Sequence, residues 1–219
     1  METTYMKKIL LLGDSIRMGY DKYVKEALEG TAEVYYPTEN CKFSQYLLRF
    51  LNEWKGKFAW PDDIDLVHWN AGLWDVPEVY GEEPISSPAH YTEMIGRIDK
   101  RIRMLFPNAK VVFATSTAVR ENGYRGVFRR YNATIERYNA LALDVLKDTD
   151  TVINDLYLHT KDILPQYCSD MTHYNTPEGA AYMGGKVLSV ICGELGIAAS
   201  EVNVEGFSLE AYSKDNIGY

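Results

Sequence analysis

A serine near the front of the chain and an Asp-x-x-His group near its end have the residue types of a nucleophilic hydrolase site. Ser15 follows Gly13 and Asp14, and Asp170 precedes His173 by three positions. A serine hydroxyl is a weak nucleophile at neutral pH unless an imidazole within hydrogen-bond distance accepts its proton. A carboxylate that bonds the other imidazole nitrogen fixes the tautomer that this transfer requires. This chemistry predicts that the two ends of the chain meet in the folded protein.

Alternating apolar runs and amphipathic segments predict the elements that bring these residues together. Short apolar runs, typical of strands buried in a parallel sheet, occur at 8–13, 32–36, 65–70, 110–115 and 151–156. Between them, helical spacing and capping residues predict helices over 16–28, 88–105, 124–147 and 177 to about 192. This alternation predicts a parallel five-stranded sheet with helices on both faces, which is a three-layer α/β/α sandwich.

Both candidate groups fall at the same edge of the predicted sheet. Ser15 follows the first strand and opens a helix, and Asp170 and His173 lie in the loop after the fifth strand. Ligands of open parallel sheets bind at the carboxyl ends of the strands, and a helix start offers the Ser15 backbone N–H to a developing oxyanion. Asp14 and Ser15 would equally serve as a helix cap, and a polar turn with locally satisfied side chains would explain Asp170 and His173. Each group alone leaves both interpretations open.

Length and composition indicate one globular domain over 1–219. The chain has 219 residues, of which 46% are apolar and 25% charged, and these are ordinary values for a soluble protein. We expect the core to span about 7–195. The tail over 202–219 has no clear periodicity, so a strap, a dimer contact and a frayed end all stay open, as does the oligomeric state.

Charge and cysteine content exclude several classes of partner. A net charge of −8 disfavours nucleic acid and anionic membranes, and a neutral small-molecule or carbohydrate substrate fits it better. The apolar runs are too short for membrane insertion, and the first eight residues lack a signal-peptide core, which predicts a cytoplasmic protein unless a leader has been removed. Three scattered cysteines, Cys41, Cys168 and Cys192, predict neither a disulfide framework nor a metal site.

The two end segments together resemble a known hydrolase family. Gly13-Asp14-Ser15-Ile16 and Asp170-Met171-Thr172-His173 resemble the first and last sequence blocks of the GDSL/SGNH hydrolases, and the resemblance extends over about 7–195. It implies the family's flavodoxin-like fold and a serine esterase without a cofactor or metal. In that family the roles fall to Ser15 as nucleophile, His173 as base and Asp170 as the carboxylate that orients the base.

The family's two middle blocks, which normally supply oxyanion donors, are atypical here. No glycine occurs between Gly30 and Gly56, so the loop over 36–44 must replace the usual glycine, with the backbone N–H of Cys41 or Lys42 as candidates. Where the family has Gly-x-Asn-Asp, alignment on Gly72 puts Trp74 in place of the asparagine. We expect the Asn70 side chain to supply the missing amide, with Asn40 as the second candidate. Asn70 could also be a turn residue bonded to its own backbone.

The remaining candidates are assigned by position. We expect substrate contacts from Asp14, Asn40, Cys41, Arg17 and Trp74, the last as an apolar wall. Structural or surface roles are favoured for His68, His159 and Arg120.

These observations predict a serine esterase for short acyl chains. The acidic charge, the many aromatic residues and the absence of a long apolar lid favour a carbohydrate O-acetylesterase. Lysophospholipase or thioesterase activity is the alternative within the family. Because fold alone does not fix function, a catalytically weak or silent carbohydrate-binding protein is the alternative from another class. A flavodoxin-like phosphate binder has little support, since the first turn lacks a glycine-rich phosphate loop.

Overall fold

A five-stranded parallel sheet forms the centre of the fold and confirms the predicted fold class. The computed structural model describes residues 5–206. The strand order is β2-β1-β3-β5-β7, and every neighbouring pair is parallel. The five strands are β1 (Lys7–Leu12), β2 (Ala32–Tyr35), β3 (Leu66–Trp69), β5 (Lys110–Ala114) and β7 (Val152–Asn154).

The apolar run of the first strand explains its place inside the sheet. Strand β1 pairs with β2 on one side and β3 on the other, with Leu10 opposite both Tyr35 and Val67. Its last four residues are fully buried, because helices cover both faces of the sheet. A strand buried in this way needs an unbroken apolar sequence rather than an alternating one.

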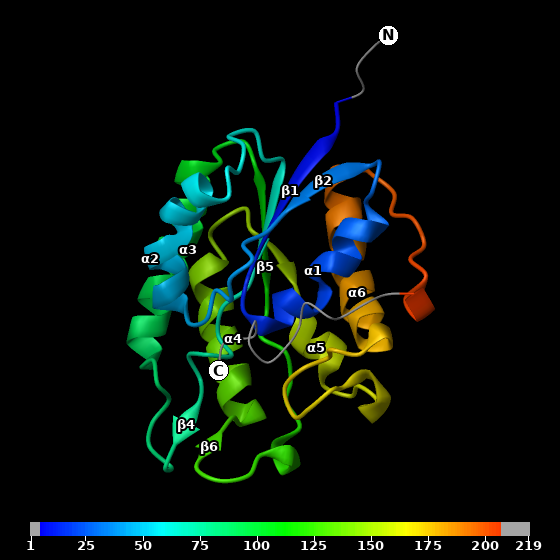
Figure 1. Ribbon diagram of the computed structural model, residues 1–219. Helices are drawn as coiled ribbons and strands as arrows, with labels where there is room; N and C mark the ends of the chain where they lie inside the picture. The colour runs from blue at the N-terminus through cyan, green and yellow to red at the C-terminus, as the bar shows by residue number, and fades with distance from the viewer. Residues whose placement is uncertain (1–4, 207–219) are drawn as a thin grey trace.

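Helices form the two outer layers (Figure 1). Helices α1 and α6 pack together on one face, and α3 lies between α2 and α4 on the other. The short helix α5 follows β7 directly. Their bounds are α1 (Ser15–Ala27), α2 (Ser44–Lys57), α3 (Pro88–Leu105), α4 (Asn132–Leu146), α5 (Leu156–Thr160) and α6 (Pro177–Leu195).

The predicted caps of α3 and α6 are present. Ser87 Oγ accepts the His90 N–H at 3.3 Å, and Thr176 Oγ1 accepts the Gly179 N–H at 2.9 Å. Each helix has proline at its first position, where the missing N–H costs no hydrogen bond. These caps fix where each helix begins, and α6 begins just after the loop that holds His173.

The helix predicted over 124–147 is wrong in its first third, because α4 starts only at Asn132. The preceding residues form a short 3-10 turn, η1 (Glu121–Gly123), and the strand β6 (Phe128–Arg129), which pairs antiparallel with β4 (Glu78–Val79). Gly126 adopts φ +78°, which a helix does not allow, and Phe128 is exposed rather than part of a buried helix face. The segment over 121–131 is therefore a loop at the carboxyl edge of the sheet.

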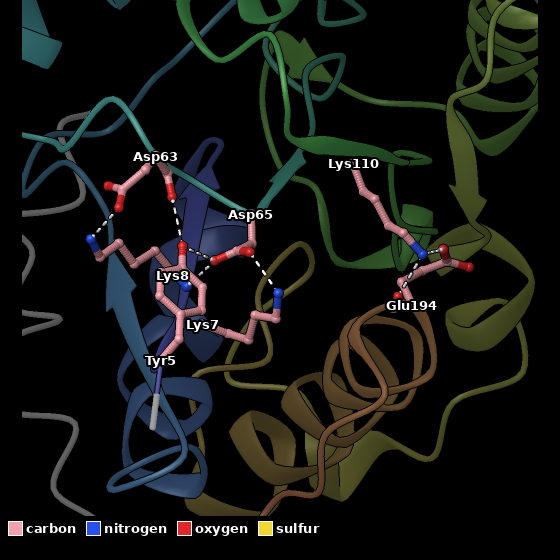
Figure 2. A network of polar contacts seen from close by, with 7 residues as sticks. All are labelled: Tyr5, Lys7, Lys8, Asp63, Asp65, Lys110 and Glu194. Atoms are coloured by element: carbon pink, nitrogen blue, oxygen red, sulfur yellow. Dashed lines mark hydrogen bonds and ion pairs between the residues drawn. The ribbon is translucent and has the colours of Figure 1, made fainter. Parts of the chain in front are cut away.

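Polar contacts fasten the opposite, amino-terminal edge. Asp65 accepts bonds from Lys7 Nζ at 2.8 Å, the Lys8 backbone N–H at 2.8 Å and Tyr5 Oη at 3.0 Å (Figure 2). In the same figure Lys110 Nζ reaches Glu194 at the end of α6, with 3.0 Å to the carboxylate. Exposed pairs of this kind contribute about 0–1 kcal/mol each, so they secure the register of the strand starts more than the overall stability.

The chain end beyond α6 is described only in part. Val204–Gly206 form a 3-10 turn, η3. The alternatives raised for the tail over 202–219 stay open, because residues 207–219 lie outside the described residues. Among residues 5–206 no helix combines the length and apolar character needed to cross a membrane.

The contact between α1 and α6 generates a paired stability prediction. A Cβ at Gly184 would lie 2.4 Å from the Tyr23 ring, whereas one at the adjacent Gly185 would meet nothing within 4 Å. We expect Gly185→Ala to stabilise the protein by about 0.5–1 kcal/mol through helix propensity. Gly184→Ala should unfold more easily than Gly185→Ala by about 1–3 kcal/mol, because the ring must move. Urea unfolding of the two variants measures this, and equal stabilities would contradict the packing described.

Candidate active site

The structure joins the two ends of the chain through a line of three side chains. Ser15 is the first residue of α1, and its Oγ lies 2.8 Å from Nε2 of His173. His173 Nδ1 lies 2.7 Å from Asp170 Oδ2. Ser15 and His173 are each only 5% exposed, so the contact between them is shielded from solvent. The predicted meeting of the two segments is therefore present as unbroken hydrogen bonding.

Asp170 is held in the charged form that orients the imidazole. Its Oδ1 accepts the backbone N–H groups of Thr172 at 2.7 Å and His173 at 2.8 Å. Burial opposes the charge, but the bonds from the His173 ring and from these two amides outweigh it and hold the pKa of Asp170 well below its ordinary value. An ionised acceptor at Nδ1 keeps the proton there, which leaves Nε2 as the acceptor that faces Ser15.

The loop that carries Asp170 and His173 is seated on the first turn of α6. A Cβ at Gly179 would lie 2.2 Å from the carbonyl oxygen of Tyr167 and 2.3 Å from that of Tyr174, so only glycine admits this approach. The Arg120 N–H also donates to the carbonyl of Met171 at 2.8 Å, which ties the loop to the segment after β5. The position of the imidazole thus depends on contacts at both ends of its loop.

The start of α1 has both functions that its sequence suggests. Asp14 Oδ1 accepts the Ile16 N–H at 3.0 Å and so caps the helix, while Ser15 directs its hydroxyl to His173. The Ser15 backbone N–H makes no hydrogen bond to any group within residues 5–206. This N–H stands at the positive end of the α1 dipole, where negative charge is favoured.

Asn70 lies beside this turn, directly after β3. Its N–H donates to the carbonyl of Leu12 at 3.1 Å, and its Oδ1 would lie only 1.9 Å from a Cβ at Gly13. Glycine at position 13 therefore lets the Asn70 side chain approach. Burial raises the pKa of the Asp14 carboxyl, and the nearby Asn70 amide acts in the opposite direction. Asn70 is thus adjacent to the serine segment, and its role as an oxyanion donor stays a prediction.

A cavity of about 370 Å³ opens beside Ser15 and His173. The structure places Trp74 in its wall, as the sequence suggests. The cavity thus gives the Ser15 hydroxyl a largely apolar chamber in front of it. The other aromatic and apolar residues of the wall are Tyr124, Phe128 and Met171.

Comparison with known proteins identifies the fold. No family model and no curated protein matches the sequence. A lipase/acylhydrolase from Enterococcus faecalis superposes with a TM-score of 0.65 at 20% identity, over 86% of this chain and 97% of that one. A GDSL-like lipase from Bacteroides thetaiotaomicron gives 0.66 at 18% identity, over 86% and 89%. An acetyl xylan esterase gives 0.63 at 17% identity, over 84% and 99%. The chain has the GDSL/SGNH hydrolase fold. At these identities the likeness extends to the fold alone.

In this GDSL/SGNH fold, the loop after β2 is expected to donate a backbone N–H to the oxyanion, and the structure does not support this. The Cys41 N–H donates to the Gly13 carbonyl at 3.1 Å, and the Lys42 N–H donates to Asn40 Oδ1 at 2.8 Å. Both amides are therefore occupied within the protein, and the assignment of Cys41 or Lys42 as donor is wrong for this structure. Cys41 is a packing residue instead: it is fully buried, its Sγ accepts the Gly13 N–H at 3.3 Å, and burial raises its pKa to about 11.

Arg17 does not face a substrate, which corrects its predicted role. Its side chain is buried, and Nη1 donates to Asp21 at 2.5 Å and to the Pro37 carbonyl at 2.9 Å. Nη2 donates to the Glu39 carbonyl at 2.6 Å. Arg17 therefore fastens the loop after β2 to α1, a purpose for which its five donors suit it.

Four cavity residues that the sequence analysis missed come from the segment wrongly assigned to a helix: Tyr124, Arg125, Phe128 and Arg130. Tyr124 Oη lies 2.7 Å from Thr172 Oγ1, next to His173, and Arg130 Nε donates to the Leu73 carbonyl at 2.5 Å. The sequence signals for this loop are the turn dipeptide Asn122-Gly123 and Gly126, which interrupts an otherwise helical pattern.

His68 and His159 have structural roles, as the sequence suggests. His68 is fully buried, with Nε2 lying 3.0 Å from Asn154 Nδ2, and burial lowers its pKa to about 3, which keeps the ring neutral. The His159 ring stacks on Tyr182 with 4.1 Å between centroids. Neither ring lines the cavity beside Ser15.

The depressed pKa of Asp170 predicts how its contribution to stability depends on pH. A carboxyl whose pKa is lower in the folded than in the unfolded state stabilises the fold above its unfolded pKa of about 3.9 and loses that contribution as the pH falls. We expect Asp170→Asn to be less stable than the unmodified protein at about pH 7. The difference should keep nearly its full size down to about pH 4 and shrink as the pH falls further, toward about pH 2. Urea unfolding across this range is the measurement. The exposed Asp162, in the same connection, provides the control Asp162→Asn, and a constant Asp170→Asn difference would contradict the charge assigned here.

Proposed function

We propose that the protein is a serine-dependent ester hydrolase that works through an acyl-enzyme. The observation that carries the proposal is the continuous hydrogen bonding from Ser15 Oγ through His173 to Asp170, at 2.8 and 2.7 Å. These distances lie within the range that proton transfer from a nucleophile to its base requires. The ester hydrolases among proteins of the same fold support the reaction class.

The geometry supports a two-step mechanism. Ser15 Oγ attacks the ester carbonyl carbon while its proton passes to His173 Nε2, and Asp170 stabilises the imidazolium that forms. His173 then gives this proton to the leaving alcohol as the ester C–O bond breaks, which leaves the acyl group on Ser15. A water molecule next transfers a proton to His173 and attacks the acyl carbon. The acid departs, and Ser15 recovers its proton from the imidazolium.

The negative charge that develops on the carbonyl oxygen during attack needs hydrogen-bond donors. The chain offers one backbone N–H and an asparagine side chain for this purpose. The Ser15 N–H at the start of α1 is the first. We assign the second to the Asn70 side chain, because the amides of Cys41 and Lys42 are occupied. Asn40 is the second candidate for this role. A site with fewer backbone donors depends more on each side chain that remains.

The size of the cavity favours short acyl groups. Its volume of about 370 Å³ is small among ligand cavities, which span roughly 300–1,000 Å³. We therefore propose short-chain esters as substrates, and acetyl groups on carbohydrates above others. The acetyl xylan esterase of the same fold supports this choice, and the lipases and acylhydrolases support the alternative of longer acyl chains. The occupied amides in the loop after β2 favour a second candidate function, a carbohydrate-binding protein with little or no catalysis.

Replacement of Ser15 tests the enzyme hypothesis directly. With 4-nitrophenyl esters from acetate to palmitate, we expect the acetate to be preferred and Ser15→Ala to lower kcat roughly 10⁴- to 10⁶-fold. The exposed Ser189, on α6, provides the control Ser189→Ala, which should keep full activity. A fluorophosphonate should label Ser15 stoichiometrically, since labelling needs an activated hydroxyl. Absence of both labelling and hydrolysis would leave the binding protein as the better account.

Replacement of Asn70 tests the oxyanion assignment. Asn70→Ala should lower kcat about 10²- to 10³-fold, because one donor to the transition state is lost, with a much smaller effect on KM. The matched variant is Asn40→Ala, and thermal melting of both checks that they fold. A large loss in Asn40→Ala with none in Asn70→Ala would reverse the assignment.

A further inference from the structure

The cavity beside Ser15 has a charge opposite to that of the whole chain. Arg125 and Arg130 line it, and none of the cavity residues among 5–206 is Asp or Glu. The full sequence has a net charge of −8. Long-range repulsion is screened beyond about 10 Å in ordinary salt, so a bound ligand experiences mainly the charges near the cavity. These are the two guanidinium groups and the Asp170 carboxylate, which stands behind His173 and already accepts bonds from its ring and from two backbone amides. The site is therefore locally suited to an anion.

Arg130 is held rigidly at this wall. It is only 8% exposed, its Nε donates to the Leu73 carbonyl at 2.5 Å, and its Nη1 lies 3.4 Å from Tyr124 Oη. Its guanidinium carbon lies 5.0 Å from the centre of the Phe128 ring. Tyr124 is itself bonded to Thr172 at 2.7 Å, beside His173. These contacts fix the plane of the guanidinium before any ligand binds.

The charge of Arg130 has no direct counter-ion among residues 5–206. No carboxylate there lies within ion-pair distance of it, whereas Arg17, the other buried arginine of the described residues, pairs with Asp21 at 2.5 Å. Asp14 interacts with Arg130 only through space, and burial raises the pKa of Asp14 more than Arg130 lowers it. A nearly buried and rigid cation without a counter-ion is costly unless a ligand supplies the anion.

We propose that Arg130 binds a carboxylate of the substrate, so that the preferred esters carry a free carboxylate near the ester bond. The planar guanidinium fork matches a carboxylate in a bidentate pair. The exposed Arg125 adds attraction at the rim. This inference rests on the proposed ester hydrolysis, and it names the class of ester. The carboxylate can belong to the acyl group, as in a dicarboxylic monoester, or to the alcohol, as in an acidic sugar.

Matched pairs of esters separate these sources. On the acyl side, 4-nitrophenyl hemisuccinate is compared with its methyl ester. On the alcohol side, acetylated galacturonic acid is compared with its methyl ester. We expect kcat/KM to favour the anionic member about tenfold or more in one pair. In Arg130→Gln that preference should fall about 10- to 100-fold, because a charged hydrogen bond is lost, and Arg130→Lys should recover part of it.

The control variant is Arg125→Gln, in which the preference should fall much less. An anionic preference that Arg130→Gln leaves unchanged, or its absence from both pairs, would overturn the proposal. An equal loss on anionic and neutral esters would also overturn it, since that result assigns Arg130 to the transition state or to the loop structure.

A binding measurement keeps this test independent of catalysis. In the Ser15→Ala background, calorimetry compares succinate and galacturonate with their neutral amides, with and without Arg130→Gln. Weaker binding of the acid in Arg130→Gln supports the carboxylate site even where no ester is hydrolysed. Ser15-dependent hydrolysis of neutral esters without any preference for acids would refute the carboxylate site and leave the esterase proposal standing.

Discussion

The hydrogen bond between Ser15 and His173 is the contact on which the site depends, because it joins residues 158 positions apart. Neither residue can be placed by its own neighbours in the sequence. Ser15 is fixed by the end of the buried strand β1, and His173 by the loop that precedes α6. The parallel sheet brings both to its carboxyl edge, and the packing of α1 against α6 sets the distance between them. A shift of either helix by about 1 Å would break a contact with this geometry.

The strand ends around Ser15 are connected by side chains and backbone groups that come unusually close. Gly13 bonds Cys41 through both its N–H and its carbonyl, and Asn70 occupies the space where a side chain at position 13 would lie. Arg17, on α1, holds the loop after β2 by donating to the carbonyls of Pro37 and Glu39. This close connection explains why the Cys41 amide is not free. The bond that ties this turn to Cys41 uses the Cys41 N–H, so that donor is not available to an oxyanion.

The sequence predicts the features that burial dictates. It misses those that depend on where a side chain points or where the backbone turns. Apolar runs without polar interruption specify interior strands, so the sheet and its helices could be expected. The chemistry of serine, histidine and aspartate predicts their meeting. By contrast, the residue type of Arg17 is the same whether its side chain faces solvent or holds a loop, so the sequence does not separate these two roles. The segment over 121–131 has apolar residues at helical spacing, and only the tertiary position of Gly126 shows that the helix cannot begin there.

Arg17 and Arg130 are both buried, but they differ in the groups to which they donate. These acceptor groups, rather than burial, separate a structural arginine from one that can bind a ligand. Arg17 is matched by the Asp21 carboxylate and three carbonyl oxygens, so its two terminal nitrogens, Nη1 and Nη2, donate within the protein. Arg130 is anchored by the Leu73 carbonyl and the Tyr124 hydroxyl, both neutral groups. Hydrogen bonds to neutral acceptors orient a guanidinium, but they leave most of its charge uncompensated. Because Arg130 also borders the cavity that Ser15 faces, an anion arriving there meets a cation already oriented, and little side-chain entropy is lost when the pair forms.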